Sequence, residues 1–230
     1  MTDPTEPVKS RRRYDSTRRR ARAEATRHRV LDVAEGRFLA DGYAATTLAA
    51  VAGDAGVSVE SIHKSVGGKA GIVRALWERS LRGAGAVPAE ARSDALSARE
   101  PDARRLIEGW SRFIGELAPR GSPLLLLVKA ASATDAELAA LVDEIERSRL
   151  TRMATNARRL LATGQVRDGL TVAHVRDVMW LHTSAEQYEL LVLRRNWPIE
   201  RYVRFVSDSM IGALLDPSPQ RRPRRRAQQA

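Results

Sequence analysis

The stretch TTLAAVAGDAGVSVESIHKSVGGK, which spans residues 46–69, predicts two short helices joined by a tight turn. Four apolar residues at helical spacing form the inner face of the first helix: Leu48, Val51, Ala52 and Ala55. Gly56 follows, where a turn needs a residue that adopts a positive φ without steric cost. Ser58 then stands where a helix N-cap belongs, and Ile62 is the inward-facing residue of the second helix. This layout is typical of a helix-turn-helix that reads DNA, and the alternative is an αα-corner inside a helical protein.

The segments on either side extend this pattern. An amphipathic helix is predicted over residues 21–40, and Asp41-Gly42 ends it. Its inner face consists of Val30, Ala34 and Phe38. Gly67-Gly68 ends the second short helix, and a further helix is predicted over residues 70–81. Residues 21–68 are therefore predicted to form a three-helix domain of the helix-turn-helix type.

The remainder of the chain is also helical by pattern, because no segment alternates apolar and polar residues over the length of a strand. Helices are predicted over residues 102–118, 123–132, 135–162, 172–195 and 199–215. The small-residue stretch 83–100 is read as a linker or a short helix. The predicted fold class is all-α, with residues 69–215 as a second helical domain.

Composition excludes several classes of protein. The 230 residues are 43% hydrophobic, and no apolar run approaches the ~18 residues that span a bilayer. The amino terminus lacks the apolar segment of a secretory signal. The chain has no cysteine, which removes disulfides, thiolate chemistry and cysteine-based metal sites. A cytoplasmic protein without a membrane segment is expected.

The net charge of +11 is concentrated at the two ends of the chain. Residues 1–30 carry ten Lys/Arg and four Asp/Glu, and residues 216–230 carry five Arg and one Asp. Residues 1–20 and 216–230 lack apolar periodicity, so they are predicted to be a disordered basic arm and a disordered basic tail. Such segments can follow a polyanion such as DNA, and the alternative is that they are solvated chain ends.

The stretch from Arg27 to Leu81 resembles the TetR (tetracycline-repressor) family of bacterial transcription regulators. The family pattern has a first helix ending in Phe-x-x-x-Gly-Tyr, then Thr-Thr/Ser, an Ile-Ala-x-x-Ala-Gly-Val-Ser stretch, and a Lys after the recognition helix. The matching residues are Phe38, Gly42, Tyr43, Thr46, Thr47, Val51, Ala52, Ala55, Gly56, Val57, Ser58 and Lys69. The resemblance implies a homodimer that binds a palindromic operator in double-stranded DNA. It also implies that residues 69–215 are a helical effector-binding and dimerisation domain.

A few positions depart from the family pattern. His63 stands where the recognition helix usually has a Tyr that touches a phosphate, and Val66 stands where a Phe is usual. Ala70 and Gly71 follow Lys69 where an acidic residue is usual. A histidine can still donate a hydrogen bond to a phosphate, although it reaches less far than a tyrosine.

The residues expected to contact DNA lie on and around the second short helix. Side chains near the N-terminal end of such a helix read base edges, so Val59, Glu60 and Ser61 are the candidates for base contacts. Glu60 either accepts from a cytosine amine or stabilises the first turn through the helix dipole. Four residues are expected to hold phosphates: Thr47, His63, Lys64 and Lys69. The complete predicted set is Arg27, Thr46, Thr47, Ser58, Val59, Glu60, Ser61, His63, Lys64 and Lys69.

The carboxy-terminal helices supply the dimer and effector residues that the resemblance implies. The candidate dimer surface consists of Ser184, Ala185, Tyr188, Leu191, Val203, Val206, Met210 and Leu214. The candidate lining of a site for an apolar or amphipathic small molecule consists of Trp110, Phe113, Met153, Met179, Trp180, His182 and Tyr188. For both sets, the alternative is that the residues complete the core of one chain.

The sequence predicts no enzymatic activity, no metal site and no cofactor. The four histidines are scattered, and the chain has no H-E-x-x-H pattern, no G-x-S-x-G elbow and no cysteine nucleophile. The predicted function is a sequence-specific DNA-binding transcriptional regulator, a repressor that a small-molecule effector releases. One alternative is a non-specific or architectural DNA-binding protein driven by its basic tails. Another is an interaction protein whose second domain docks a different polypeptide.

Overall fold

The computed structural model of the chain describes residues 8–83, 85 and 87–216, with side chains from residue 18 onward. The described part is built from helices and contains no β-strand, so the prediction of an all-α fold is confirmed. None of the described helices is long and apolar enough to cross a membrane. The predicted tail beyond residue 216 and the first seven residues of the predicted arm lie outside the described residues.

Two compact units divide the chain. The first unit comprises the described residues up to 80 together with 123–143, and the second comprises residues 81–122 and those from 144 onward. Two long helices, α6 (Ala103–Ser132) and α7 (Ala136–Leu161), therefore contribute to both units. The domain boundary predicted after residue 68 assumes that each domain is one continuous stretch of the chain. The two ends of a long helix can instead pack in different units, and the order of residues along the chain does not reveal this.

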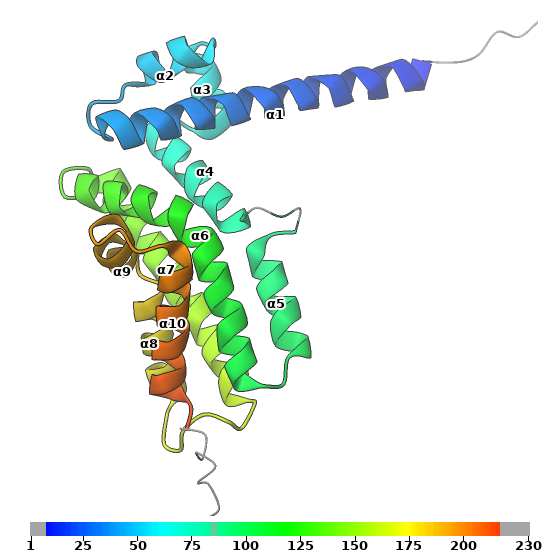
Figure 1. Ribbon diagram of the computed structural model, residues 1–230. Coiled ribbons are helices and arrows are strands. Elements are labelled where there is room, and N and C mark those ends of the chain that lie inside the picture. The colour runs from blue at the N-terminus through cyan, green and yellow to red at the C-terminus, as the bar shows by residue number, and fades with distance from the viewer. Residues whose placement is uncertain (1–7, 84, 86, 217–230) are drawn as a thin grey trace, which may run out of the picture. The chain divides into compact units, whose positions relative to one another are not determined.

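Four helices begin the first unit (Figure 1): α1 (Val8–Asp41), α2 (Leu48–Ala55), α3 (Val59–Val66) and α4 (Lys69–Arg82). Their common core contains the fully buried side chains of Phe38 and Ile62, and the burial of such apolar surface stabilises the unit. Arg79 of α4 pairs with two acidic residues of α1, Asp32 at 2.5 Å and Glu35 at 2.7 Å. These ion pairs fix α4 against the carboxy-terminal third of α1.

Helix α1 begins at Val8, inside the arm that the sequence analysis predicts to be disordered. That prediction rested on missing apolar periodicity, and the described side chains of residues 18–25 are indeed exposed rather than packed. Arginine and alanine are nevertheless strong helix formers, and neither glycine nor proline interrupts residues 8–35. The prediction of disorder was therefore wrong for residues 8–20, because a helix without a buried face leaves no periodic signal.

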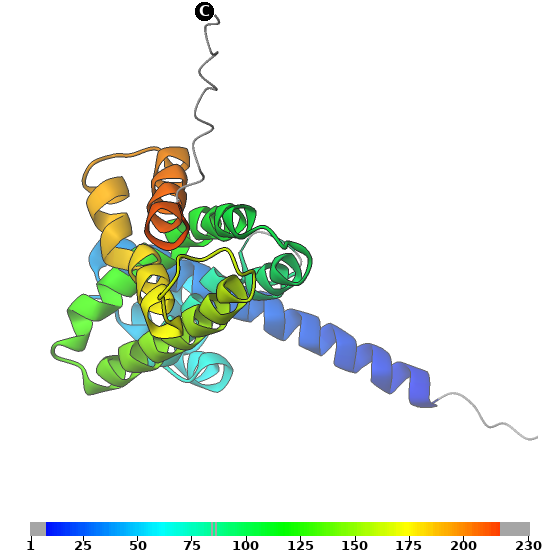
Figure 2. The ribbon, with the colours of Figure 1, turned by 90° about the horizontal axis from the view of Figure 1, so that it is seen from below.

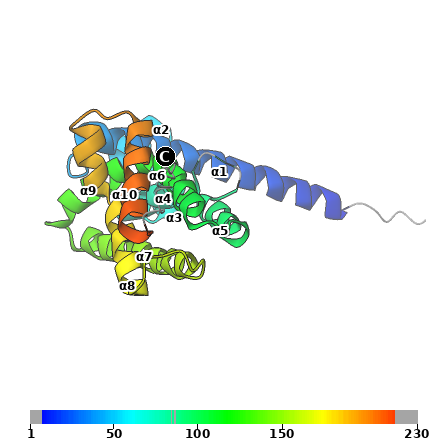
Figure 3. The ribbon, with the colours of Figure 1, turned by 60° about the horizontal axis from the view of Figure 1, so that its bottom comes forward.

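The second unit is a helical bundle. Besides the parts of α6 and α7 that belong to it, it contains α5 (Ala89–Arg99), α8 (Val172–His182), α9 (Ala185–Tyr188), the π-helical turn η1 (Glu189–Leu193) and α10 (Ile199–Leu214). Helix α10 contacts both α8 and η1 (Figure 3). The core is formed around Leu106 and Ile107 of α6 and around Tyr202 and Val206 of α10, all of them fully buried.

Two predicted helix boundaries differ from the structure. Helix α6 continues through Pro119 and Pro123, where the sequence predicts a break. The two compact units divide at residue 123, so these prolines mark a change of packing partner rather than the end of a helix. The helix predicted over 172–195 instead stops before Thr183, and the side chain of Ser184 caps α9. A serine at this position is a strong N-cap, and the prediction overlooked it.

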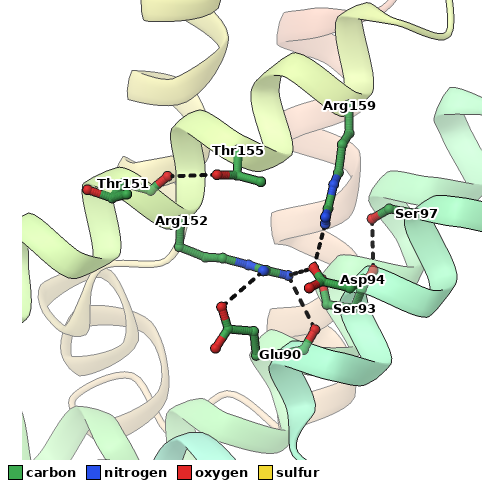
Figure 4. A network of polar contacts seen from close by, with 8 residues as sticks. All are labelled: Glu90, Ser93, Asp94, Ser97, Thr151, Arg152, Thr155 and Arg159. Atoms are coloured by element: carbon green, nitrogen blue, oxygen red, sulfur yellow. Dashed lines mark hydrogen bonds and ion pairs between the residues drawn. The ribbon is translucent and has the colours of Figure 1, made fainter.

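Arginine side chains of α7 hold α5 in place within the second unit (Figure 4). Arg159 and Arg152 contact the same carboxylate of Asp94, at 2.5 Å and 2.7 Å, and these hydrogen bonds lower the pKa of Asp94. Arg92 of α5 makes a bidentate pair with Glu116 of α6, at 2.9 Å and 2.6 Å. Partly exposed pairs such as these contribute little stability singly, but together they determine how α5 lies between its neighbours.

Candidate nucleic-acid interface

The turn between α2 and α3 has the geometry that the sequence predicts. Gly56 adopts φ 63° and ψ 41°, in the left-handed region, and ends α2. Val57 donates its backbone N–H to the carbonyl of Ala52 at 3.0 Å. At the start of α2, the side chain of Thr47 accepts from the N–H of Ala50 at 3.1 Å. Side-chain and backbone caps therefore close both ends of α2, which fixes where α3 begins.

Helix α3 exposes one face and buries the other. The hydroxyl of Ser58 accepts from the N–H of Ser61 at 3.1 Å, and Gly67, with φ 83°, ends the helix. The side chain of Ile62 is fully buried. The exposed residues of α3 include Val59, Glu60, Ser61, His63 and Lys64, all of which are predicted DNA contacts. An exposed helical face with its ends capped can enter a major groove without first refolding.

Two arginines of α1 anchor α2, and the sequence analysis did not identify this role. Arg29 donates from its Nε to the carbonyl of Ala55 at 3.2 Å, at the end of α2. Arg37 pairs with the carboxylate of Asp54 at 2.6 Å. Asp54 is the only acidic residue in positions 44–59, which is the signal that could have revealed the pair. These contacts hold the helix-turn-helix at a fixed place on α1.

The junction between α3 and α4 leaves no space for a side chain at Gly71. A Cβ atom at this position would overlap the carbonyl group of Val66, which is backbone and cannot rotate away. Gly71 lies in the first turn of α4, close to the end of α3. The departure from the TetR pattern at Gly71 therefore has a steric cause. Helices α3 and α4 approach so closely that a residue with a side chain does not fit at position 71.

Lys69 is held by its own domain. Its ammonium lies 4.0 Å from the centre of the Tyr43 ring, a cation–π contact. Burial lowers the pKa of Lys69, and the nearby charge of Asp135 opposes this effect. Burial, together with the charges of Asp135 and Glu137, raises the pKa of Tyr43 to about 12. Lys69 therefore has a structural role in addition to the phosphate contact predicted for it.

The remaining predicted DNA contacts fall into different environments. Thr46 is 1% exposed, and its hydroxyl donates to the carbonyl of Gly42 at 2.9 Å. Thr46 is therefore removed from the set, because its side chain turns into the domain rather than toward a ligand. Arg27 is partly exposed on α1, and Thr47 is exposed at the start of α2. The ring of His63 lies beside Gly68, where a Cβ atom would approach it to 3.2 Å.

The predicted effector residues all belong to the second unit. Trp110, Met179 and Tyr188 are buried in its core cluster, and the others are partly buried: Phe113, Met153, Trp180 and His182. His182 accepts from or donates to the side-chain amide of Gln187 at 3.0 Å, and burial lowers the pKa of His182. Helical spacing does not distinguish residues that line a ligand site from residues of the core, so these residues remain a prediction.

Buried polar atoms without a hydrogen-bond partner in the protein occur in the same unit. The indole Nε1 of Trp110, the Oδ1 of Asn156 and the hydroxyl of Tyr202 belong to residues that are 4%, 5% and 0% exposed. They come from α6, α7 and α10. Asn156 and Tyr202 are not among the residues predicted from the sequence, because a polar residue on an apolar helical face gives no sign of whether it finds a hydrogen-bond partner.

The predicted dimer surface is largely part of the core. Five of its members are buried in the second unit: Ala185, Tyr188, Val206, Met210 and Leu214. Ser184 caps α9, and Leu191 and Val203 are partly buried. These five belong to the core of one chain, which is the alternative stated for them. Helical spacing identifies an apolar face but not the partner of that face. The exposed large apolar residues of the same helices are Leu181, Leu190, Leu193 and Phe205.

The part of the chain that the structure describes contains no cluster of three His, Asp or Glu side chains that could hold a metal ion. The geometry instead centres on an exposed, capped helix beside cationic and hydroxyl groups. Such a surface binds a polyanion through positioning rather than through covalent chemistry.

Comparisons with known proteins agree on the fold. No protein-family model and no curated protein matches the sequence. Among solved structures, SmeT in a complex with triclosan is 20% identical, with a TM-score of 0.65 over 84% of this chain and 93% of SmeT. NalD, the secondary repressor of the MexAB-OprM multidrug efflux pump in Pseudomonas aeruginosa, is 19% identical, with a TM-score of 0.64 over 84% and 98%.

A protein from Syntrophomonas wolfei that is assigned to the TetR family of transcriptional regulators is 14% identical, with a TM-score of 0.64 over 83% of this chain and 95% of that protein. The chain has the TetR fold. The likeness stated for residues 27–81 therefore extends to the fold of the larger part of the chain, 83% to 84% of its residues. In this TetR fold, α2 and α3 form the helix-turn-helix, and α3 presents an exposed face.

Proposed function

We propose that the protein is a sequence-specific DNA-binding transcriptional regulator and not an enzyme. The observation that carries the proposal is the exposed face of α3, held on the buried Ile62 and capped by Ser58 and Gly67. Because the side chains of this face are exposed, they are available for a ligand. A helix of this kind fits the major groove, where its first residues meet base edges.

The chemistry of the face assigns different roles to its residues. Val59 is 36% exposed and offers an apolar surface to a thymine methyl group. The hydroxyl of Ser61 can donate to a base or remain paired with the Ser58 hydroxyl at 2.9 Å. Lys64 and Thr47 offer an ammonium group and a capped helix N-terminus to phosphates. Sequence preference should therefore depend on Val59 and Ser61, and general affinity on Lys64.

Replacing Lys64 with alanine is expected to weaken binding to all DNA sequences alike. Losing one phosphate contact should lower the slope of log K against log salt by about 1. Fluorescence anisotropy titrations with a duplex selected from a random library, and with unselected duplex, measure both quantities. Arg158→Ala is the matched control, because Arg158 is an exposed cation on α7 in the second unit. An unchanged salt slope would remove Lys64 from the phosphate contacts.

Selection from random DNA also separates the proposed function from its rival. A regulator keeps its selected duplex in a large excess of unselected DNA, whereas a non-specific or architectural binder is competed away. A palindrome among the selected sequences would support a two-fold dimer with half-sites one helical turn apart. Failure to enrich any sequence would favour the non-specific alternative.

We further propose that the regulator acts as a cytoplasmic homodimer. The exposed side chains of Leu181, Leu190, Leu193 and Phe205 lie on α8, η1 and α10. These apolar side chains are 37% to 57% exposed, so removing them from water lowers the free energy. A second copy of the chain presents the same four side chains and can cover them. This surface replaces the mostly buried residues that the sequence predicts for the dimer.

Repression and its release by an effector complete the proposed function. Arg149 is 12% exposed, pairs with Glu146 at 2.6 Å and donates to the carbonyl of Thr183 at 2.8 Å. The charge of Arg149 is already neutralised by Glu146, so it is not available to an anionic ligand. The unpaired atoms of Trp110, Asn156 and Tyr202 can form hydrogen bonds with neutral groups of a ligand. An uncharged, mostly apolar molecule with hydrogen-bonding groups is therefore the effector class that fits. Its binding would shift the dimer between two geometries with different operator affinities.

Replacing Tyr202 with phenylalanine tests this interpretation of the core. The change deletes a buried hydroxyl without a protein partner and keeps the ring contact with Tyr188, whose centroid is 5.5 Å away. We expect the free energy of unfolding to rise by about 1 kcal/mol, or at least not to fall. Urea unfolding measures it, with Tyr188→Phe as the matched control. A clear loss of stability would mean that the hydroxyl has a partner.

The effector class is tested by thermal unfolding with two probes. Triclosan, the ligand named in the SmeT complex, represents an apolar molecule with a hydroxyl group. Decanoate represents an amphipathic anion. Triclosan is expected to raise the unfolding temperature, and less so in the Tyr202→Phe variant, whereas decanoate is not. Stabilisation by decanoate alone would contradict the uncharged class.

A further inference from the structure

Helix α1 continues well beyond the helices of the helix-turn-helix. Its amino-terminal half runs past α2 and α3 in Figure 1, and Figure 2 shows the same projection from another direction. Arg29, which donates to the carbonyl of Ala55, marks where the end of α2 lies along α1. From there back to Val8 the helix extends for 21 residues, or ~32 Å at 1.5 Å per residue. That length is close to one turn of DNA.

The described side chains of the projecting part of α1, from residue 18 to residue 25, carry charge and form no apolar face. Residues 18–25 are all exposed. Residues 8–29 contain ten Lys/Arg and only two Asp/Glu, and the only apolar side chains in residues 15–29 are those of alanines. A helix that is polar on all sides has no stripe to bury against another helix. What it offers a partner is positive charge.

Two arginines of this segment lie on the same faces of α1 as Arg27 and Arg29, which are beside the helix-turn-helix. Arg20 and Arg27 are seven residues apart, and so are Arg22 and Arg29. Seven residues make nearly two helical turns, so each pair shares one face of α1 at a separation of ~10 Å along its axis. Over ~10 Å of its own axis, a DNA duplex presents about six phosphate charges. Each pair therefore joins one arginine beside the helix-turn-helix to a second one farther out, with a charge spacing that a duplex can match.

We propose that residues 8–25 of α1 form a helical basic arm that binds the phosphate backbone of DNA outside the segment contacted by α3. The proposal rests on the proposed function for the position of the DNA, but the arm needs no particular base sequence. Its contacts add affinity for any duplex long enough to reach it. The arm therefore sets the strength and salt dependence of binding, and α3 sets the preference.

An acidic protein is the other partner that a basic helix could suit, and the structure favours DNA for two reasons. Stable protein interfaces are anchored by several buried aromatic or large apolar side chains, and residues 8–25 contain only Val8 and Tyr14 of these kinds. The arm is also continuous with the helix to which Arg29 and Arg37 fix α2, so a duplex at α3 lies close to the same helix. A uniform polyanion needs no anchor residue, because released counterions supply the free energy.

The test is a double variant of the full-length chain, Arg20→Gln with Arg22→Gln, measured on random-sequence duplex of about 40 base pairs. Two lost phosphate contacts should lower the slope of log K against log salt by about 2. Arg104→Gln with Arg105→Gln is the matched control, because both residues are exposed on α6 in the second unit. Circular dichroism checks that the helical content is retained, since glutamine is also a good helix former.

Duplex length separates the arm from the reading helix. On a selected duplex trimmed to its recognition sequence, the double variant should bind as the unmodified chain does, whereas Lys64→Ala should still weaken binding. An unchanged salt slope on the long random duplex, or an equal loss on the trimmed one, would overturn the proposal. So would binding of polyglutamate that depends on Arg20 and Arg22 while binding of DNA does not. Failure to select any sequence would count against the proposed function alone, because the arm is tested on random DNA.

Discussion

Replacing Gly71 with alanine is expected to destabilise the first unit, although alanine is the better helix former. In the interior of a helix, the change from glycine to alanine normally adds about 0.5–1 kcal/mol of stability. At Gly71 the new Cβ atom would overlap the carbonyl group of Val66. Because that obstacle is backbone, α3 and α4 must separate to make space. Overpacking of this kind costs about 1–3 kcal/mol, so the expected sign is opposite to the usual one.

Two glycines in the same unit provide matched controls. Gly36 of α1 and Gly53 of α2 are helical and exposed, and nothing lies within 4 Å of a Cβ atom at either position. Gly36→Ala and Gly53→Ala should therefore stabilise the protein by the normal increment, while Gly71→Ala destabilises it. Urea unfolding followed by circular dichroism measures all three. A gain of stability in Gly71→Ala would show that the junction between α3 and α4 is looser than the structure has it.

The same substitution is expected to weaken DNA binding. Val66 belongs to α3, so displacing its carbonyl moves the end of the reading helix that bears Lys64. Misplacement of a contact residue by even a short distance removes a phosphate contact that depends on geometry. Affinity for selected duplex should fall in Gly71→Ala and stay unchanged in Gly36→Ala, which separates this effect from a general change in stability.

The helix-turn-helix was predictable because its signals are local. Gly56 adopts the left-handed conformation and Ser58 the capping geometry that their residue types favour, and α3 ends at Gly67 as expected. Caps and turns depend on a few neighbouring residues, so a single sequence contains nearly all the information. The assignment of Ile62 to the core followed from helical periodicity and is likewise confirmed.

Properties that depend on distant partners were not predictable. Both Thr46 and Thr47 are predicted to contact DNA, yet the tertiary fold buries Thr46 while Thr47 is an exposed cap. Likewise, Val206 and Leu214 lie on an apolar face whose partner is the core of their own unit, and periodicity cannot tell this from a dimer face. A pattern identifies which side of a helix is apolar, but the partner of that side is set by the tertiary fold.

Replacing Leu190 and Leu193 with aspartate is expected to separate the proposed dimer into single chains. Both side chains are large and exposed, by 55% and 46%, and both lie on η1. Two carboxylates at these positions would face their own copies across a two-fold interface, where burying unpaired like charges costs several kcal/mol. A loss of that size corresponds to a dissociation constant at least a hundredfold higher.

The consequence for DNA binding follows from the number of half-sites that one particle contacts. A dimer holds two copies of α3 on one palindrome, whereas a single chain holds one and loses the advantage of linked binding. Affinity for selected palindromic duplex should therefore fall at least a hundredfold in the Leu190→Asp, Leu193→Asp variant. Binding to a duplex with one half-site should change little, because α3 belongs to the other compact unit.

Sedimentation velocity measures the oligomeric state, and anisotropy titration measures the two affinities. Val87→Asp is the control, because Val87 is 52% exposed in the second unit but lies outside α8, η1 and α10. The free energy of unfolding of a single chain should change little in either variant, since none of the three side chains is part of the core. If the double variant remains dimeric and binds the palindrome as tightly as before, the exposed apolar surface on η1 does not join the two copies. In that case another surface must hold the two reading helices together.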